Sequence, residues 1–194
     1  MDIRYYKAVI ILFAPGQGGE HLANIISTSA HIENIIAKRV DNKYHQDLQY
    51  YCSSGAKDST TSKVGFVNTT EICDMLSEAD KPWVIAGHID ETYYLYEYIK
   101  NLGPYVFITF EHFNLTDYIK RRMQPYDDGL VRLLYREKVV SKLFDTKNGM
   151  ALDPAKLFEE SPYDLLSDLS RDLSLDLDLD FCLDLHKKWF NKIK

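Results

Sequence analysis

Residues 8–26, AVIILFAPGQGGEHLANII, join an apolar run to a glycine-rich loop and then to a helical pattern. The run from Ala8 to Phe13 is typical of a buried strand, and apolar residues recur at helical spacing from Leu22 to Ile26. Glycine permits positive φ, and a loop before a helix lets backbone N–H groups converge on an anion. The stretch contains neither Gly-Lys-Ser/Thr nor G-x-G-x-x-G, the two commonest nucleotide-binding motifs. The sequence therefore predicts a βα unit whose loop binds a phosphate or sulfate group.

Two further apolar runs predict strands that pair with the first. WVIAG at 83–87 and YVFITF at 105–110 are rich in β-branched and aromatic residues. Helical patterns over 71–79 and 92–100 precede them, and HQDLQYYC at 45–52 also looks helical before a polar loop. Strands that alternate with helices indicate an α/β fold of three layers, in which helices flank a mainly parallel sheet.

Candidate chemical groups follow the predicted strands. Ligands bind beyond the carboxyl ends of parallel strands, where the sequence places the glycine loop, His88 and the pair Glu111-His112. His88 comes directly after Gly87 and is a candidate general base, because a neutral imidazole takes up a proton near neutral pH. The alternative is a histidine that only makes a hydrogen bond at the end of a strand.

Helices are predicted to dominate the second half of the chain. A helix capped by Asn114 and an amphipathic stretch over 129–144 precede the segment Ser161-Pro162-Tyr163-Asp164. In that segment Ser161 is the expected helix cap and Pro162 the first helical residue. A terminal helix is expected to begin near Asp178 or Asp180. Its apolar face is predicted to be a stripe of residues spaced four apart: Leu177, Phe181, Leu185, Trp189 and Ile193.

Length and composition narrow the class of protein. The 194 residues, 45% hydrophobic and 27% charged, fit one compact domain over 1–194. A net charge of -6 argues against a nucleic-acid partner held by bulk electrostatics. No run is long enough to span a membrane, and the first apolar run lacks a signal-peptide cleavage site. Cys52, Cys73 and Cys182 are widely spaced, which suits buried, reduced thiols and a cytoplasmic location.

Three segments of the chain resemble the sulfotransferase family. These P-loop-like α/β enzymes transfer a sulfuryl group from 3'-phosphoadenosine 5'-phosphosulfate to a hydroxyl or amine. FAPGQGGEHLANII is similar to the family's first strand, its P-K-S-G-T-T-W-L loop and the following helix. WVIAGHI resembles the strand that ends in the family's catalytic histidine, and YVFITFEHFNLTDYIKRR resembles the strand and helix that bind the 3'-phosphate. The pattern from Leu157 to Phe190 is similar to the family's closing helices.

The resemblance implies a role for each matching residue. His88 would be the catalytic base, and Arg121 and Arg122 would bind the 3'-phosphate of the donor. The acceptor would be a small molecule or a glycan, and no nucleic acid or membrane would be involved. The remaining donor contacts would come from the glycine loop and the start of its helix: Pro15, Gly16, Gln17, Gly18, Gly19, Glu20 and His21.

Departures from the family pattern keep other functions open. Gly16 stands where the family has lysine, and Glu20 replaces a hydroxyl residue, so a non-catalytic binding or structural protein with the same fold is a second hypothesis. A nucleotide or small-molecule kinase is a third, weakened by the missing Gly-Lys-Ser/Thr motif. The cation that the loop lacks would have to come from Lys57, Lys63, Arg121 or Arg122. No metal site is expected, because His21 and His112 have no cysteine or carboxylate partners at ligand spacing.

Overall fold

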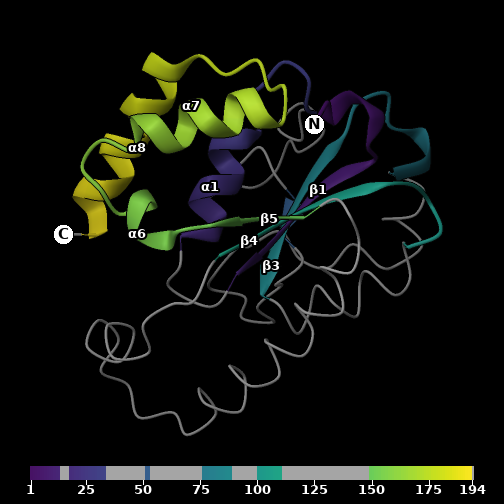
Figure 1. Cartoon of the computed structure of the whole chain (residues 1–194), viewed down its shortest axis with the longest axis horizontal. Helices are drawn as coiled ribbons and strands as arrows, with labels where there is room; N and C mark the ends of the chain where they lie inside the picture. The colour runs from purple at the N-terminus through teal and green to yellow at the C-terminus, as the bar shows by residue number, and fades with distance from the viewer. Residues whose placement is uncertain (14–17, 34–50, 53–75, 89–99, 111–148, 194) are drawn as a thin grey trace, which may run out of the picture.

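A computed structural model describes residues 1–13, 18–33, 51–52, 76–88, 100–110 and 149–193 (Figure 1). The described strands form a five-stranded sheet in the order β2-β3-β1-β4-β5. Every pairing in this sheet is parallel. The fold is therefore α/β, and the three strands predicted from the sequence are confirmed. The strands are β1 (Ala8–Phe13), β2 (Tyr51–Cys52), β3 (Trp83–His88), β4 (Tyr105–Phe110) and β5 (Gly149–Leu152).

The central strands are buried on both faces. All six residues of β1 and all six of β4 are buried. Because side chains alternate along a strand, Val9 and Ile11 point into the main hydrophobic core, whereas Ile10 and Leu12 point to the opposite face. Both pairs are at most 1% exposed. Burial on both faces explains why the strand is a continuous apolar run, and it is what the predicted three layers require.

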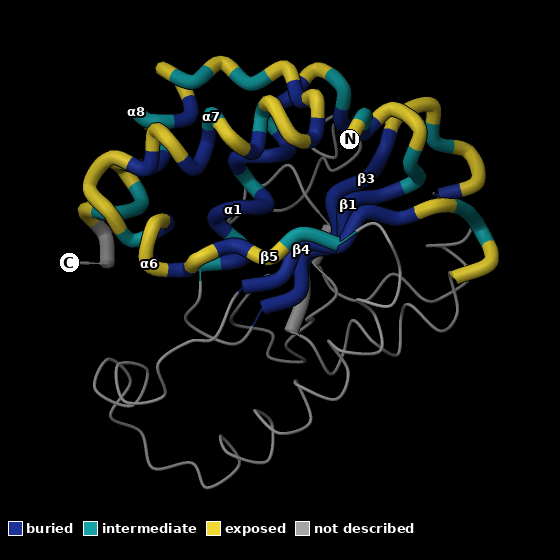
Figure 2. Tube along the Cα trace, viewed as in Figure 1, coloured by how far each residue is buried: buried dark blue, intermediate teal, exposed yellow. Residues whose placement is uncertain are grey.

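The helices α1, α7 and α8 lie on one side of the sheet (Figure 1). Helix α1 packs directly against β1 and β3, and α8 packs against α1 and α7. The buried residues of these helices face the strands and one another, while their other faces are exposed (Figure 2). The helical elements are η1, a 3-10 helix (Ile3–Tyr5), α1 (Gly19–Ile26), α6 (Pro154–Leu157), α7 (Tyr163–Asp172) and α8 (Leu179–Ile193).

Two strands correct the sequence analysis. Tyr51–Cys52, the end of the helix-like stretch 45–52, forms β2 and pairs with β3 at Ile85 and Ala86. Gly149–Leu152 forms β5 beside β4 and was not predicted as a strand. Of the helix predicted over 71–79, the structure describes residues 76–78 as helical. The helices predicted over 92–100, after Asn114 and over 129–144 lie outside the described residues, apart from Lys100, which lies in a turn.

The starts of the last two helices differ by one residue or less from the prediction. Helix α7 begins at Tyr163, with Pro162 rather than Ser161 at the cap position. Pro162 has a ψ of 38°, outside the helical range, so the regular helix begins one residue later than predicted. Helix α8 begins at Leu179, and the Asp178 carboxylate accepts a hydrogen bond of 3.1 Å from the N–H of Phe181. The prediction of a start near Asp178 is confirmed.

The apolar stripe predicted for the terminal helix is confirmed only in part: Leu177 packs against the core and Trp189 stacks on His21, but Phe181 does not face inward. Phe181, a member of that stripe, is 49% exposed, whereas Cys182 and His186 are fully buried. A helix turns once in 3.6 residues, so residues spaced by four advance about 40° at each step and wind around the helix. The two fully buried side chains, Cys182 and His186, each lie one position after a member of the predicted stripe, Phe181 and Leu185. Cys182 is confirmed as a buried, free thiol; the side chains of Cys52 and Cys73 lie outside the described part.

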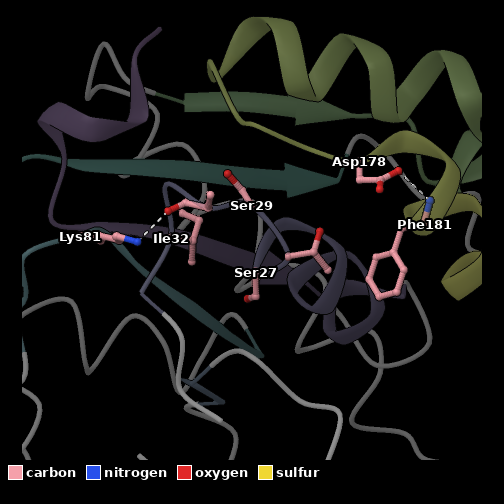
Figure 3. A pocket seen from close by; sticks show the side chains of 8 residues that line it. Ser27, Ser29, Ile32, Lys81, Asp178 and Phe181 are labelled. Carbon is pink, nitrogen blue, oxygen red and sulfur yellow. Dashed lines mark hydrogen bonds between the residues drawn. The ribbon is translucent and has the colours of Figure 1, made fainter. Parts of the chain in front are cut away.

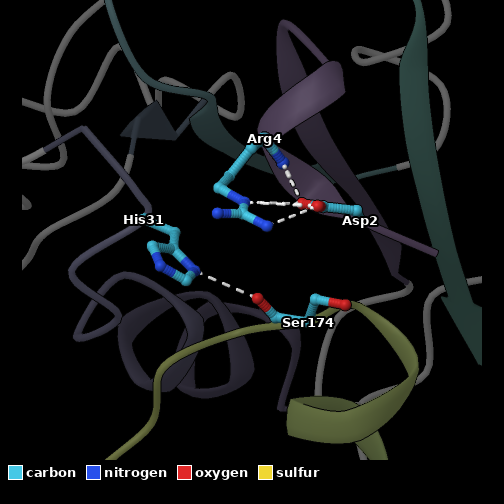
Figure 4. A network of polar contacts seen from close by, with 4 residues as sticks. All are labelled: Asp2, Arg4, His31 and Ser174. Atoms are coloured by element: carbon cyan, nitrogen blue, oxygen red, sulfur yellow. Dashed lines mark hydrogen bonds and ion pairs between the residues drawn. The ribbon is translucent and has the colours of Figure 1, made fainter.

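The N-terminal segment is tied to the turn that follows α7 (Figure 4). The N–H of Ile3 donates to the carbonyl of Leu173 at 3.0 Å, and His31 Nδ1 donates to the carbonyl of Ser174 at 3.0 Å. Asp2 and Arg4 form a bidentate ion pair beside this turn. Ser174 has φ 52°, a left-handed conformation that glycine usually occupies after a helix.

Candidate functional site

The carboxyl ends of the two strands that carry the candidate residues lie side by side. Phe13, the last residue of β1, is in register with His88, the last residue of β3. The chain runs from β1 outward to β2, returns to β3 and then crosses β1 to reach β4. The carboxyl end of β1 is therefore the point where the strand order reverses, and this point is the usual ligand-binding crevice of an open parallel sheet. The backbone of His88 lies at this edge; its side chain is outside the described part.

Gly18 occupies a conformation that requires glycine. It is the N-cap residue of α1 and has φ 77°. A Cβ atom at Gly18 would also lie 2.9 Å from Leu157 Cδ2 and 3.4 Å from Trp189 Cη2. An L-residue in this position meets both backbone strain and a steric clash. The first turn of α1 is thus fitted closely against α6 and α8.

Gly19 is required by its contact with the strand before it. A Cβ atom at Gly19 would lie only 2.2 Å from Cγ of Phe13. The absence of a side chain lets α1 begin directly against the end of β1. Two of the loop glycines therefore have structural reasons to be glycine, whether or not the loop binds a ligand.

The first turn of α1 presents backbone donors at the reversal point of the sheet. Within the described part of the chain, the N–H groups of Gly18 and Gly19 make no hydrogen bond. Free N–H groups at a helix N-terminus carry partial positive charge and favour an anion. Glu20 lies in the same turn and brings a carboxylate to it. An anion at these N–H groups is attracted by the helix dipole and repelled by the Glu20 charge.

His21, predicted as a donor-binding residue, has its side chain buried against the C-terminal helix. Its Nε2 lies 3.1 Å from Nδ1 of His186, and His186 Nε2 lies 2.8 Å from the carbonyl oxygen of Glu159. A carbonyl only accepts, so His186 donates from Nε2 and accepts at Nδ1 the proton of His21 Nε2. The imidazole of His21 also stacks on the indole of Trp189, with centroids 4.1 Å apart and planes within 3°. Donor binding by His21 stays a prediction.

The two histidines are neutral at neutral pH. Burial, with a further contribution from His186, lowers the pKa of His21 to about 3. Burial also lowers the pKa of His186, partly opposed by its hydrogen bond to Glu159. Desolvation disfavours the imidazolium in both cases. His21 therefore does not supply the positive charge that the lysine provides in the sulfotransferase loop.

His186 is fully buried and was not predicted as a site residue. One signal for it exists in the sequence. His186 follows Cys182 by four residues, in line with the apolar residues of the helix, and a histidine on an apolar line must find a hydrogen-bond partner. The sequence does not say that the partner is His21, because the two residues are 165 positions apart.

Several predicted site residues lie outside the described part, so their roles stay predictions. These are Pro15, Gly16, Gln17, Arg121 and Arg122, together with the candidate cations Lys57 and Lys63. Among the residues that the structure describes, no group of three or more His, Cys, Asp or Glu side chains is placed to hold a metal ion.

A pocket of about 280 Å³ lies at the far end of α1 (Figure 3). Hydroxyl residues at the end of α1 line it together with Lys81, Asp178 and Phe181. Lys81 Nζ donates to the carbonyl of Ala30 at 2.8 Å, and the Ser27 hydroxyl donates to that of Ala23 at 2.7 Å. Lys81 precedes β3, so the pocket lies at the amino edge of the sheet. The pocket is separate from the point where the strand order reverses. Its Lys81 and Ser27 side chains are bonded to backbone carbonyls in and just after the end of α1.

The chain was compared with protein families, curated proteins and solved structures. No protein-family model, curated protein or solved structure matches the chain. None of the helices in the described ranges is both long and apolar enough to cross a membrane.

Proposed function

We propose that this chain is a sulfotransferase-like enzyme that transfers a sulfuryl group to a hydroxyl or amine acceptor. The observation that carries the proposal is the register of Phe13 with His88. It brings a candidate general base to the strand end from which the glycine loop leads to the helix N-terminus. Both elements lie at the carboxyl edge of the sheet, and the loop leaves this edge from β1, the strand at which the strand order reverses.

The described residues fit a small oxyanion on the loop. The N–H groups of Gly18 and Gly19 would hold the phosphosulfate group of the donor, with Gln17 extending the same set. Arg121 and Arg122 would bind the 3'-phosphate. The donor, 3'-phosphoadenosine 5'-phosphosulfate, supplies the sulfuryl group when bound. Backbone donors fixed in place before the reaction stabilise developing negative charge without reorganisation.

His88 would act on the acceptor. Its imidazole takes the proton of the acceptor hydroxyl as the acceptor oxygen forms a bond to sulfur. The bond between sulfur and the bridging phosphate oxygen breaks on the opposite side, and adenosine 3',5'-bisphosphate leaves with that electron pair. The proton then returns from His88 to solvent. A positioned base of this kind contributes about 10² to 10⁴ in rate.

A non-catalytic binding protein of the same fold is the second candidate. Gly16 replaces the family's lysine, Glu20 adds a carboxylate to the first turn of α1, and His21 is neutral. Each of these features lowers the affinity of the loop for a doubly charged group. The second candidate predicts a ligand without turnover, or no anionic ligand at the loop.

Calorimetric titration with adenosine 3',5'-bisphosphate, with ATP as the comparison ligand, tests the proposal. Glu20→Gln removes the carboxylate from the first turn of α1. The variant is expected to bind the bisphosphate more tightly, because the repulsion between the carboxylate and the ligand is gone. Glu78→Gln removes an exposed carboxylate from the segment before β3, at the other edge of the sheet, and serves as the matched control. Selective bisphosphate binding with sulfuryl transfer to an acceptor panel supports the enzyme. Binding without transfer favours the second candidate, and no binding overturns the anion site.

A further inference from the structure

We propose that helix α8 sets the orientation of the first turn of α1, the turn that begins with Gly18 and Gly19. His186 acts on this turn through His21, and Trp189 acts on it directly. The expected effect on ligand binding rests on the proposed function, in which the N–H groups of Gly18 and Gly19 in that turn bind the donor. His186 and Trp189 would be positioning residues, because they act on the first turn of α1 and not on the reacting atoms. Their effect is on the direction in which the N–H groups point.

The contacts form a continuous path from α8 to the loop. His186 is anchored to the carbonyl of Glu159 at 2.8 Å and holds His21, the third residue of α1, at 3.1 Å. Trp189 lies one turn further along α8, stacks on the His21 ring and approaches Gly18. His21 is 6% exposed and His186 is fully buried. Both edges of the first turn are therefore held from the same helix.

The hydrogen bonds add direction to this packing. The Glu159 carbonyl accepts only, which fixes the proton of His186 on Nε2 and leaves Nδ1 as the acceptor for His21. Each imidazole is thus restricted to one tautomer and one ring orientation. An apolar side chain at 186 would fill space but would leave the buried N–H of His21 without an acceptor, a costly arrangement. The first turn of α1 would then move to find a new partner.

Three substitutions at one position separate these roles. His186→Leu removes both polar contacts. His186→Asn places an amide oxygen where Nδ1 lies and keeps an acceptor for His21. His186→Gln places an amide nitrogen near Nε2 and keeps the donor to Glu159 but not the acceptor. Cys182→Ala is the matched control, because Cys182 is fully buried one turn earlier on α8 and contacts Thr28 beyond the other end of α1.

The measurements are bisphosphate affinity, the amide resonances of Gly18 and Gly19 in the ligand-free protein, and the melting temperature. His186→Leu is expected to weaken bisphosphate binding about tenfold and to shift or broaden both glycine resonances. His186→Asn should recover most of the affinity and the resonances, and His186→Gln should not. Cys182→Ala should lower the melting temperature while leaving affinity and resonances near those of the wild type.

Two results would overturn the inference. One is an equal effect of His186→Leu and Cys182→Ala on the glycine resonances at equal loss of melting temperature, which means that α8 only adds stability. The other is equal recovery by His186→Asn and His186→Gln. If the wild-type protein binds no bisphosphate, the proposed function fails, but the resonances of Gly18 and Gly19 still decide whether His186 positions the turn.

Discussion

His88 and Phe13 end neighbouring parallel strands in the same register. The residue after Phe13 enters the glycine loop, so the loop and the candidate base leave the sheet from adjacent strands at one level. Adjacent parallel strands are separated by about 4.8 Å, a distance that a ligand of a few atoms spans. This relationship allows one small molecule to contact both elements, and it sets the first prediction.

Replacing His88 with alanine should remove catalysis and spare the fold. If His88 is the general base, His88→Ala lowers single-turnover sulfuryl transfer by about 10² to 10⁴ and leaves bisphosphate affinity nearly unchanged. His31→Ala is the control, because His31 bonds to the Ser174 carbonyl beside the turn after α7. A loss of about 1 to 3 kcal/mol in unfolding free energy with unchanged turnover would assign His88 a structural role.

Adding one methyl group at Gly19 should destabilise the protein through Phe13. The new Cβ would lie 2.2 Å from Phe13 Cγ, so the strand end or the helix start must move. Gly19→Ala is expected to cost about 1 to 3 kcal/mol in urea unfolding. Combined with Phe13→Leu, the same change should cost less than the sum of the two single changes, since the clash is relieved. Additive costs would show that the two residues do not meet.

The free energy of unfolding should begin to fall below pH 6.5, at a higher pH than the one at which carboxylates titrate. The pKa of His21 is about 3 in the folded protein against an ordinary value of 6.5, so the unfolded chain binds more protons between these values. The stabilisation is complete above pH 6.5 and is lost as pH falls toward 3, by about 2 to 3 kcal/mol between pH 6.5 and 4.5. Urea unfolding of the wild type and of His21→Phe checks this.

The acid response of the His21→Phe variant should be shallower than that of the wild type. Phenylalanine keeps a ring against Trp189 but cannot take up a proton. Asp2 also has a lowered pKa, about 2 against 3.8, chiefly because of its hydrogen bond to Arg4, but that stabilisation is lost only below pH 3.8. Parallel curves for wild type and variant between pH 6.5 and 4.5 would mean that His21 accepts protons in the folded state.

Glycine at position 174 should stabilise the turn after α7. Ser174 has φ 52°, where a Cβ atom costs about 1 kcal/mol, and glycine relieves that cost. Its contact with His31 uses the backbone carbonyl and is retained in the variant. Thermal and urea unfolding of Ser174→Gly should show a gain of about 0.5 to 1 kcal/mol, and Ser174→Val a loss. A loss with glycine would place the stabilising role in the serine side chain.

The elements that could be predicted from the sequence are those whose signal lies within one continuous segment. β1, β3 and β4 are each six residues of mostly apolar sequence, and a strand buried on both faces needs such a run. β2 has two residues and β5 has four, too few for a periodic signal, and both are strands because β3 and β4 pair with them. Asp178 was identifiable because a cap acts within three residues of itself.

The candidate site likewise has one part that local sequence predicts and another that depends on tertiary contacts. The glycine loop and His88 are visible in the sequence because each follows a predicted strand directly. The contact of His21 with His186 is not, since it depends on how α8 crosses α1, a property of tertiary packing that local patterns do not contain. Trp189 was placed on an apolar stripe, and its stacking on His21 could not be inferred from that position.

The distance along the chain between His21 and His186 has a consequence for the order of folding. The first turn of α1 is synthesised before the residue that covers it, His186, which follows His21 by 165 positions. At ribosomal rates of 5 to 20 residues per second, that interval is on the order of 10 s. β1 likewise waits for β3 and β4 before it has neighbours on both sides. The nascent chain therefore carries an unpaired apolar strand until β3 and β4 emerge, and a helix start without its covering side chains until α8 emerges.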